Sequence, residues 1–407
     1  MQIKNTDFIR EHREDDVRLL ALQASRYADI DVPFAIQQID GWQRARIKLP
    51  SWAAHDDILY PPHLALEQCS SETTARYKAL LCQRLLHDFG SMTDLTGGMG
   101  VDFSFLAPLF EKATYIEQQQ HLCEAARHNF QVLGISHAIV TEGDGIEVLA
   151  CLPHQQLIFI DPARRDTHGG RTFAISDCTP NILPILPTLM EKTDLLMVKL
   201  SPMLDWHQTA KLLDAACPGA LREIHLIATN NECKELLVVL DTRQANPSVA
   251  LHCVNDDTRF ITDTQEEQQL LPCPTLANAE EATTASWLYE PNAAIMKAGC
   301  FATLTQRFPI CALADNSHLF VSEHHLPDFP GRRLHILHMT TTNKKQLREA
   351  LKGIERANIT VRNFPMSADQ LRRKLKIGDG GDVWLYASTI LRHEHIIFVC
   401  EKALSNG

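Results

Sequence analysis

Asp94-Leu-Thr-Gly-Gly-Met-Gly-Val-Asp102 is the stretch around which this 407-residue sequence is organised. A short apolar segment precedes it, and residues 103–110 continue with the apolar spacing of a helix. The order strand, glycine turn, helix is typical of an open α/β sheet at the place where bare backbone meets a nucleotide-like ligand. Gly98 and Gly100 allow the chain to turn tightly and to approach a ligand without a Cβ in the way.

The turn does not fit the dinucleotide pattern G-x-G-x-x-G, because Phe103 stands where a glycine or alanine is required. It fits D-x-T-x-G-x-G, in which an acid opens the turn. A carboxylate repels a pyrophosphate and attracts a cation, and S-adenosylmethionine carries a sulfonium and an ammonium but no phosphate. The turn resembles motif I of the class I S-adenosylmethionine-dependent methyltransferases. That resemblance implies that the cofactor is held by Asp94, Thr96, Gly97, Gly98 and Gly100.

Three further acids follow predicted strands. Residues 113–117 end in Glu117, about 20 residues after the turn, where an acid grips ribose hydroxyls in doubly wound folds. The strand predicted at 139–144 ends in Asp144, which resembles the acid that meets the adenine amino group, and the strand predicted from residue 157 ends in Asp161 and a proline. Each acid alone is equally well explained as a helix cap or a solvated turn. Four of them in this order favour a cofactor site at the carboxyl edge of one sheet.

Length and composition predict a soluble, intracellular protein of two or three domains. The apolar fraction is 45% and the charged fraction 22%, which is typical of globular proteins. Since no apolar run approaches the roughly 18 residues of a membrane span and the start lacks a signal peptide's apolar core, we expect a cytoplasmic protein without membrane segments. The 12 cysteines occur singly, which predicts reduced thiols and neither disulfides nor a metal site.

Charge is distributed unevenly along the chain. Residues 331–407 contain 14 Lys/Arg and 7 Asp/Glu, a net charge of +7, so residues 1–330 carry −18 of the total of −11. The acidic residues 1–330 suggest a module that binds the cofactor and carries out the chemistry, and the basic residues 331–407 suggest a second module that binds a polyanion such as RNA. A solvated helix face is the alternative interpretation. The basic side chains expected to contact RNA are Arg372, Arg373, Lys374 and Lys376.

Apolar patterns divide the chain into four parts. Residues 1–85 are predicted to be mainly helical, with a short strand at 42–49 where residues alternate. Residues 86–265 form the sheet-and-helix domain, an acidic and glutamine-rich linker follows, and residues 285–331 form a small unit. Residues 332–407 have the order β-α-β-α-β-β, which is typical of a small α+β RNA-binding module.

From about residue 60 to its end the chain resembles a bacterial family of class I methyltransferases with a ferredoxin-like insert and a C-terminal THUMP-like domain. The resemblance implies a Rossmann-like α/β sheet and small C-terminal α+β domains, in addition to the N-terminal helical region that the apolar pattern predicts. THUMP domains are associated with tRNA and RNA modification, so it also implies RNA as the substrate. The residues that carry it are Glu67-Gln-Cys-Ser-Ser-Glu72, Asp94–Asp102, Asp161-Pro-Ala-Arg164, Asn231-Glu-Cys-Lys-Glu235, Tyr289-Glu-Pro291 and Asn363-Phe-Pro365.

Asp161-Pro162 lies where amino-methyltransferases carry an acid or Asn followed by Pro-Pro-aromatic. In that signature the acid and a nearby carbonyl accept hydrogen bonds from an exocyclic amine and aim its lone pair at the methyl group. Here Ala163 and Arg164 replace the second proline and the aromatic residue. An arginine guanidinium can stack on a base or clamp a phosphate, so Asp161, Pro162 and Arg164 are the predicted catalytic residues.

Asp161-Pro-Ala-Arg164 also resembles the Asp-Pro-Pro-Arg of RNA pyrimidine C5 methyltransferases, which need a nucleophilic cysteine. Cys233 would serve only if Lys234 favoured its thiolate, and a structural cysteine is the alternative. Two further features are open between structural and functional interpretations: Lys199 at a strand end, and the polar segment Glu67–Glu72, which serves either as helix capping or as a wall of the active site.

The sequence therefore predicts an S-adenosylmethionine-dependent methyltransferase that acts on a nitrogen of a base in RNA, either tRNA or rRNA. Two alternatives are a small-molecule or protein methyltransferase, and a non-catalytic RNA-binding protein with a degenerate methyltransferase fold. The target nucleotide, the methylated atom and the oligomeric state do not follow from the residues.

Overall fold

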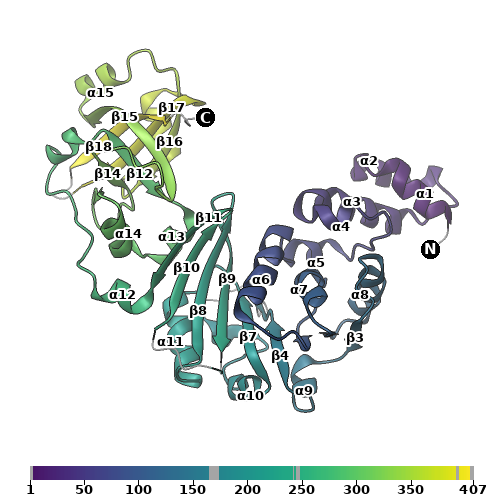
Figure 1. The fold of residues 1–407 in the computed structure, drawn as a ribbon. Helices are drawn as coiled ribbons and strands as arrows, with labels where there is room; N and C mark the ends of the chain where they lie inside the picture. The colour runs from purple at the N-terminus through teal and green to yellow at the C-terminus, as the bar shows by residue number, and fades with distance from the viewer. Residues whose placement is uncertain (1–2, 165–173, 242, 244–247, 391–393, 404–407) are drawn as a thin grey trace. The chain divides into compact units, whose positions relative to one another are not determined.

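The computed structural model describes residues 3–164, 174–241, 243, 248–390 and 394–403 (Figure 1). The chain forms two compact units, the first made of residues 1–224 and 235–247 and the second of residues 225–234 and 248–407. The division therefore passes through strands β8 (Leu221–Thr229) and β9 (Glu232–Asp241). A nine-stranded sheet has the order β11-β10-β8-β9-β7-β4-β1-β2-β3.

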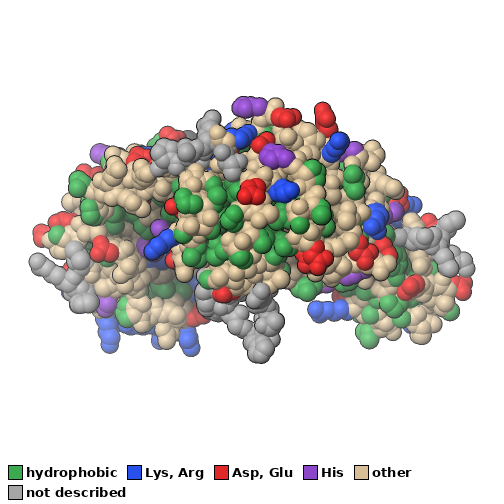
Figure 2. Space-filling view, turned by 90° about the horizontal axis from the view of Figure 1, so that it is seen from below, with side chains coloured by type: hydrophobic (Ala, Val, Ile, Leu, Met, Phe, Trp, Pro, Cys, Tyr) green, Lys and Arg blue, Asp and Glu red, His purple; other side chains and the backbone are tan. Residues whose placement is uncertain are grey.

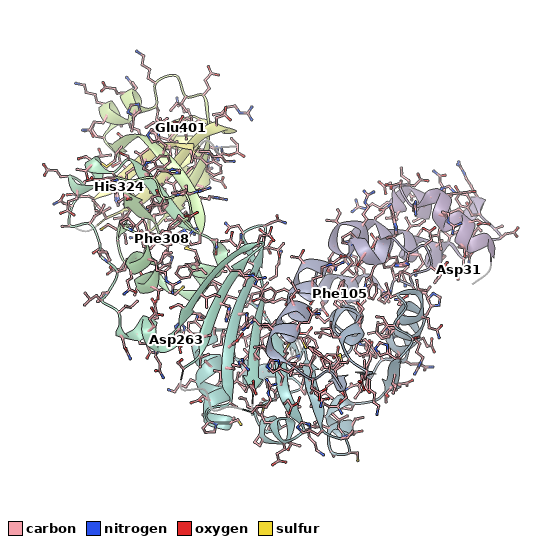
Figure 3. All side chains as sticks on the ribbon, in the orientation of Figure 1. Asp31, Phe105, Asp263, Phe308, His324 and Glu401 are labelled. Atoms are coloured by element: carbon pink, nitrogen blue, oxygen red, sulfur yellow. The ribbon has the colours of Figure 1, made fainter. Side chains whose placement is uncertain are left out.

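Residues 3–85 are mainly helical (Figure 1), with α1 (Ile3–His12), α2 (Val17–Leu22), α3 (Val32–Lys48), α4 (Pro50–Ala53), α5 (His63–Gln68) and α6 (Glu72–Leu85). The short strand predicted at 42–49 is wrong, because residues 42–48 belong to α3 and Leu49 is its C-cap. Asp31, labelled in Figure 3, caps this helix by accepting a hydrogen bond from the Phe34 N–H at 3.2 Å. Ala35, Ile39 and Ala45 lie on its buried face at helical spacing.

Five strands of the first unit run parallel: β1 (Ser91–Asp94), β2 (Lys112–Glu117), β3 (Ala138–Glu142), β4 (Gln155–Ile160) and β7 (Thr193–Leu200). Strand β9 pairs antiparallel with β7. The helices of this part are α7 (Val101–Leu106), α8 (Gln120–Val132), α9 (Gly145–Leu149), α10 (Leu186–Glu191) and α11 (Trp206–Ala216), and a short ladder joins β5 (Ala163–Arg164) to β6 (Cys178–Thr179).

The strand order reverses between β1 and β4, since β2 and β3 lie on one side of β1 and the later strands on the other. Ligands of doubly wound sheets bind outside the carboxyl ends of the strands at such a reversal. Both β4 and β7 are almost entirely buried. This explains their continuous apolar sequences, because a parallel strand is covered on both faces.

The second unit contains a seven-stranded sheet of order β13-β14-β12-β15-β18-β17-β16. Its last six elements have the predicted order: β15 (Gly331–Thr341), α15 (Lys344–Ala350), β16 (Arg356–Arg362), α16 (Ala368–Leu375), β17 (Gly378–Thr389) and β18 (His395–Lys402). Before them come β10 (Ala250–Asn255), β11 (Thr258–Asp263), α12 (Thr264–Gln269), β12 (Trp287–Pro291), α13 (Ala293–Ala298), α14 (Phe301–Arg307), β13 (Cys311–Ala312) and β14 (Phe320–Ser322). Asp263, labelled in Figure 3, caps α12.

The predicted fold class, a Rossmann-like sheet with an N-terminal helical region and small C-terminal α+β domains, is confirmed. The domain boundaries drawn from the sequence stay a prediction. Within the described residues, no helix has both the length and the apolarity needed to cross a bilayer. Among the side chains coloured in Figure 2, Lys and Arg are interspersed with Asp and Glu on the face drawn there.

Candidate active site

The glycine turn leaves β1 at Asp94 and enters α7 at Val101. Its three glycines are needed for different reasons. A Cβ on Gly97 would lie 2.2 Å from the Tyr115 ring, and one on Gly100 would lie 2.8 Å from Phe130, so packing excludes side chains there. Gly98 has a φ of 56°, but a Cβ on it would have only a carbonyl oxygen at 3.8 Å as a neighbour. Gly98 is therefore the position of the turn that faces open space.

Asp94 lies at the floor of the turn and is 1% exposed. It accepts a hydrogen bond from the Thr96 N–H at 2.9 Å. Burial raises the pKa of Asp94 to about 8, the Thr96 N–H opposes this, and the nearby Asp102 and Asp161 carboxylates add to the rise. At neutral pH this carboxyl is mostly protonated, and a cation placed beside it would favour the ionised form.

Thr96 joins the carboxyl ends of β1 and β4. Its hydroxyl accepts a hydrogen bond from the Asp161 N–H at 2.6 Å. Thr96 thus fixes the backbone of Asp161 at the strand reversal.

Glu117 ends β2 and is half-buried. Its two carboxylate oxygens accept hydrogen bonds from the Gly98 N–H and the Gln119 N–H, each at 2.8 Å. The structure therefore brings Glu117 against the open position of the glycine turn. Each oxygen has a second lone pair that can accept a hydrogen bond from a ligand hydroxyl.

Asp144 does not end a strand. It follows β3 (Ala138–Glu142) and is the N-cap of α9, because its carboxylate accepts from the Ile146 N–H at 2.8 Å. The other oxygen accepts from the Gln118 side chain at 2.9 Å. Gln118 adjoins Glu117, so the two acids lie at neighbouring strand ends. The capping role explains Asp144 without a ligand, and its role towards adenine stays a prediction.

Asp161 follows the last residue of β4, and Lys199 is the penultimate residue of β7. The register pairs Ile160 of β4 with Val198 of β7. The residues that follow them, Asp161 and Lys199, are therefore neighbours across the two parallel strands. Their side chains form an ion pair. Pro162 is buried. Arg164 lies in β5, but its side chain is outside the part of the chain that the structure describes, so the predicted clamp stays a prediction.

Lys199 belongs to a buried cluster that the sequence interpretation did not assemble. Its ammonium lies 4.0 Å from Asp102, whose other oxygen lies 3.0 Å from the Lys78 ammonium. Lys78 is fully buried in α6 and forms an ion pair with Glu235 of β9. The single Ser70 hydroxyl lies within hydrogen-bonding distance of Asp102 (2.6 Å) and Glu235 (3.0 Å) and accepts from Lys78 at 3.1 Å.

The structure separates the two interpretations of Glu67–Glu72 residue by residue. Ser71 is the N-cap of α6, and Glu72 accepts from the Ser51 N–H at 2.7 Å, so both serve local structure. Ser70 instead enters the buried cluster. The sequence signal for this cluster was the presence of Ser70 and Glu235 within the two quoted motifs Glu67–Glu72 and Asn231–Glu235.

Cys233 lies in the second unit. Its thiol donates to the Ala293 carbonyl at 3.3 Å, and burial raises its pKa. Lys234 forms an ion pair with Glu232 at 2.7 Å. The condition for a nucleophilic Cys233, a thiolate favoured by Lys234, is therefore not met, and the structural interpretation of this cysteine is favoured.

The basic residues predicted to bind RNA lie at the end of α16, also in the second unit. Arg372 forms an ion pair with Asp379 at 2.6 Å and donates to the Ala357 and Gly378 carbonyls, so it serves the local fold. Arg373, Lys374 and Lys376 are exposed. These three remain the candidates for contact with a polyanion.

Family models match the second unit: a ferredoxin-like domain at residues 287–330 and a THUMP domain-like module at residues 331–402. The whole chain is similar to a crystal structure from Porphyromonas gingivalis W83 that is described as a candidate methyltransferase. The identity is 30%, 98% of each chain is covered, and the TM-score is 0.84.

A second match is a SAM-dependent methyltransferase from Agrobacterium tumefaciens, at 13% identity, with coverage of 43% of this chain and 64% of the other and a TM-score of 0.33. No curated protein matches the sequence.

Proposed function

Because this chain belongs to the same family as the Porphyromonas gingivalis protein, that of class I methyltransferases with a ferredoxin-like and a THUMP-like domain, we propose that it uses S-adenosylmethionine to methylate a nitrogen of a base in RNA, either tRNA or rRNA. The observation that carries the proposal is the set of acids at the strand reversal: Asp94 ends β1, Asp161 follows β4, and Glu117 accepts a hydrogen bond from the Gly98 N–H.

The residues fit a cationic cofactor. Among the described residues, the three carboxylates of Asp102, Asp161 and Glu235 accompany the two ammonium groups of Lys78 and Lys199, and the protonated Asp94 would add a fourth negative charge on ionising. Such a surplus of buried negative charge is costly unless a cation compensates it. The ammonium and sulfonium of S-adenosylmethionine would do so, while a phosphate would add to the repulsion.

Glu117 and Gly98 would hold the ribose and the methionine end. Glu117 presents a half-buried carboxylate whose oxygens each accept one backbone hydrogen bond and retain a lone pair for a ribose hydroxyl. A hydrogen bond to a charged acceptor contributes about 1.5–3 kcal/mol. Thr96, Gly97 and Gly100 would keep the turn in the shape that leaves Gly98 open.

When bound, S-adenosylmethionine supplies the methyl group: its C–S bond breaks while the acceptor nitrogen forms the new N–C bond. Asp161 would accept a hydrogen bond from the exocyclic amine and aim its lone pair, which its 34% exposed side chain supports. The proton that the new ammonium loses passes to Asp161 or to solvent. Positioning of this kind supplies most of what methyl transfer requires.

RNA is proposed as the substrate because residues 331–407 carry a net charge of +7 and match the THUMP domain-like model. Arg373, Lys374 and Lys376 give this module an exposed basic group. Phosphate contacts of this kind weaken steeply as salt rises.

The proposal is tested by mass spectrometry of nucleosides from tRNA and rRNA of cells with and without the protein. The expected result is one methylated nucleoside that disappears in its absence and returns when the purified protein and S-adenosylmethionine are added to that RNA. Heat on titration with S-adenosylmethionine, but no change in any nucleoside, would instead indicate a small-molecule or protein substrate. No heat and no change would indicate a non-catalytic protein.

A further inference from the structure

We propose that Lys199 is a positioning residue of the methyl-transfer site, which holds the Asp161 carboxylate ionised and fixed towards the acceptor amine. The proposal deepens the proposed function and rests on it. Its basis is the geometry of the buried cluster formed by Lys78, Ser70, Asp102, Glu235 and Lys199, to which Asp161 is attached.

The first argument is the exposure of the two partners. The Lys199 side chain is 10% exposed and the Asp161 side chain 34% exposed. The lysine therefore lies behind the carboxylate and the carboxylate lies at the accessible end of the pair. A substrate can reach Asp161 while Lys199 stays covered, which is the arrangement expected of a residue that acts through another.

The second argument is that the two carboxylate oxygens of Asp161 have different partners. Lys199 pairs with Oδ2, and the Asp161 backbone N–H is held by Thr96. With one oxygen and the backbone fixed, the carboxylate has a set orientation. Oδ1 is the oxygen that remains to accept a hydrogen bond from an acceptor amine.

The third argument is electrostatic. Although its side chain is partly exposed, Asp161 is packed among enough protein atoms for burial to raise its pKa, and the Lys199 ammonium opposes that rise. Burial lowers the pKa of Lys199, but Asp161, Asp102 and Glu235 outweigh it and raise the pKa, so the lysine stays charged. A protonated Asp161 would offer a hydrogen-bond donor where the amine needs an acceptor.

The fourth argument explains why the cluster extends beyond Lys199. A single lysine between Asp161 and Asp102 could pair with either acid. Lys78 and Ser70 already contact the Asp102 carboxylate, and Glu235 pairs with Lys78. They leave Asp102 4.0 Å from Lys199, while Asp161 is in direct contact with it. Ser70 and Lys78 thus connect the helical segment before the sheet to the geometry of the acceptor site.

The test is a mutant cycle with the full-length protein and total RNA from cells that lack it. The variants are K199M, K199R, D161N and D161N/K199M, with K211M as a control because Lys211 is exposed on α11. Transfer of a labelled methyl group is measured from pH 5 to 9 at saturating S-adenosylmethionine, and cofactor affinity is measured by calorimetry.

For K199M we expect kcat at neutral pH to fall at least about tenfold and the acid limb of the pH–rate profile to move up by about 1–3 pH units, the range by which a neighbouring opposite charge shifts a carboxylic acid. K199R should restore part of the activity, and K211M should match the wild type. Cofactor affinity should change little in all of them.

If Lys199 acts only through Asp161, D161N/K199M will be no slower than D161N. The double variant leaves no unpaired buried charge between the two, so it serves even if K199M does not fold. An unshifted acid limb in K199M, or a double variant much slower than D161N, would overturn the proposal. Absence of methyl transfer by the wild type would remove the proposed function and this inference together, whereas an active wild type with an unchanged K199M would remove the inference alone.

Discussion

Replacing Asp94 by Asn should make the protein more stable at neutral pH than the wild type, by an amount that depends on pH. Burial raises the pKa of Asp94 to about 8 from the 3.8 of an exposed carboxyl. An acid whose pKa is raised on folding contributes stability that is complete below the unfolded pKa and is lost as pH rises through the folded pKa. Between these two pKa values the free energy of unfolding falls by about 1.36 kcal/mol per pH unit. From pH 5 to pH 7 the wild type should therefore lose about 2.7 kcal/mol relative to Asp94→Asn.

The assay is urea unfolding of both proteins, followed by circular dichroism at pH 5, 6, 7 and 8. The two proteins are compared by the difference in their free energies of unfolding at each pH, so that the contributions of the other titrating groups cancel. Asn keeps an oxygen that can accept from the Thr96 N–H. Asp88→Asn is the matched control, because Asp88 is exposed just before β1. A difference between wild type and Asp94→Asn that is constant from pH 5 to pH 8 would refute the assignment of a protonated, buried Asp94.

The same carboxyl links cofactor binding to pH. A group with a pKa of about 8 is about 90% protonated at pH 7. If the ammonium of S-adenosylmethionine binds beside Asp94, the ionised form is favoured and about 0.9 proton should leave the wild type on binding. Calorimetry in two buffers of different ionisation enthalpy measures this number. Asp94→Asn should release almost none, and equal release from both proteins would place the ammonium elsewhere.

Three further outcomes are expected. Glu117→Ala should weaken S-adenosylmethionine binding at least about tenfold, since a hydrogen bond to a charged acceptor contributes about 1.5–3 kcal/mol; equal calorimetric affinity would exclude Glu117 as the ribose ligand. Asp161→Ala should leave that affinity nearly intact but abolish transfer of a labelled methyl group to RNA, and unchanged turnover would remove Asp161 from the mechanism. Replacing Arg373, Lys374 and Lys376 by Gln should reduce the slope of log K for RNA binding against log salt concentration by up to about 2, because each phosphate contact on a single strand contributes about 0.7. Filter binding at several salt concentrations measures this slope, and an unchanged slope would exclude the three residues as RNA contacts.

Local patterns were enough to predict the strands and the turn that carry the proposed cofactor site. Asp94, Glu117 and Asp161 each follow an apolar run, and the carboxyl ends of parallel strands meet at one edge of a sheet. The strand order β3-β2-β1-β4 and the hydrogen bond from the Gly98 N–H to Glu117 agree with that expectation. The glycines illustrate a limit of this reasoning, because Gly97 and Gly100 are required by Tyr115 and Phe130, which the sequence does not place beside them.

Two predictions were wrong because the same local pattern is compatible with two kinds of structure. Alternation at 42–49 suggested a strand, but residues 42–48 continue α3, which follows the Asp31 cap and buries Ala35, Ile39 and Ala45. Packing over several turns outweighed a short alternating pattern. Asp144 was placed at a strand tip, but it caps α9, since an acid after a strand serves equally well at the start of the next helix.

The order of residues along the chain was sufficient to specify the glycine turn, the acids that follow the buried strands and the basic C-terminal module, because each depends on neighbours a few positions away. The partners of those acids depended on the folded chain. Lys199 meets Asp161 across 38 residues, Ser70 meets Asp102 across 32, and Lys78 meets Glu235 across 157. Charges so far apart come into contact only when the sheet is assembled and water is excluded, and a buried ion is stable only with its partner.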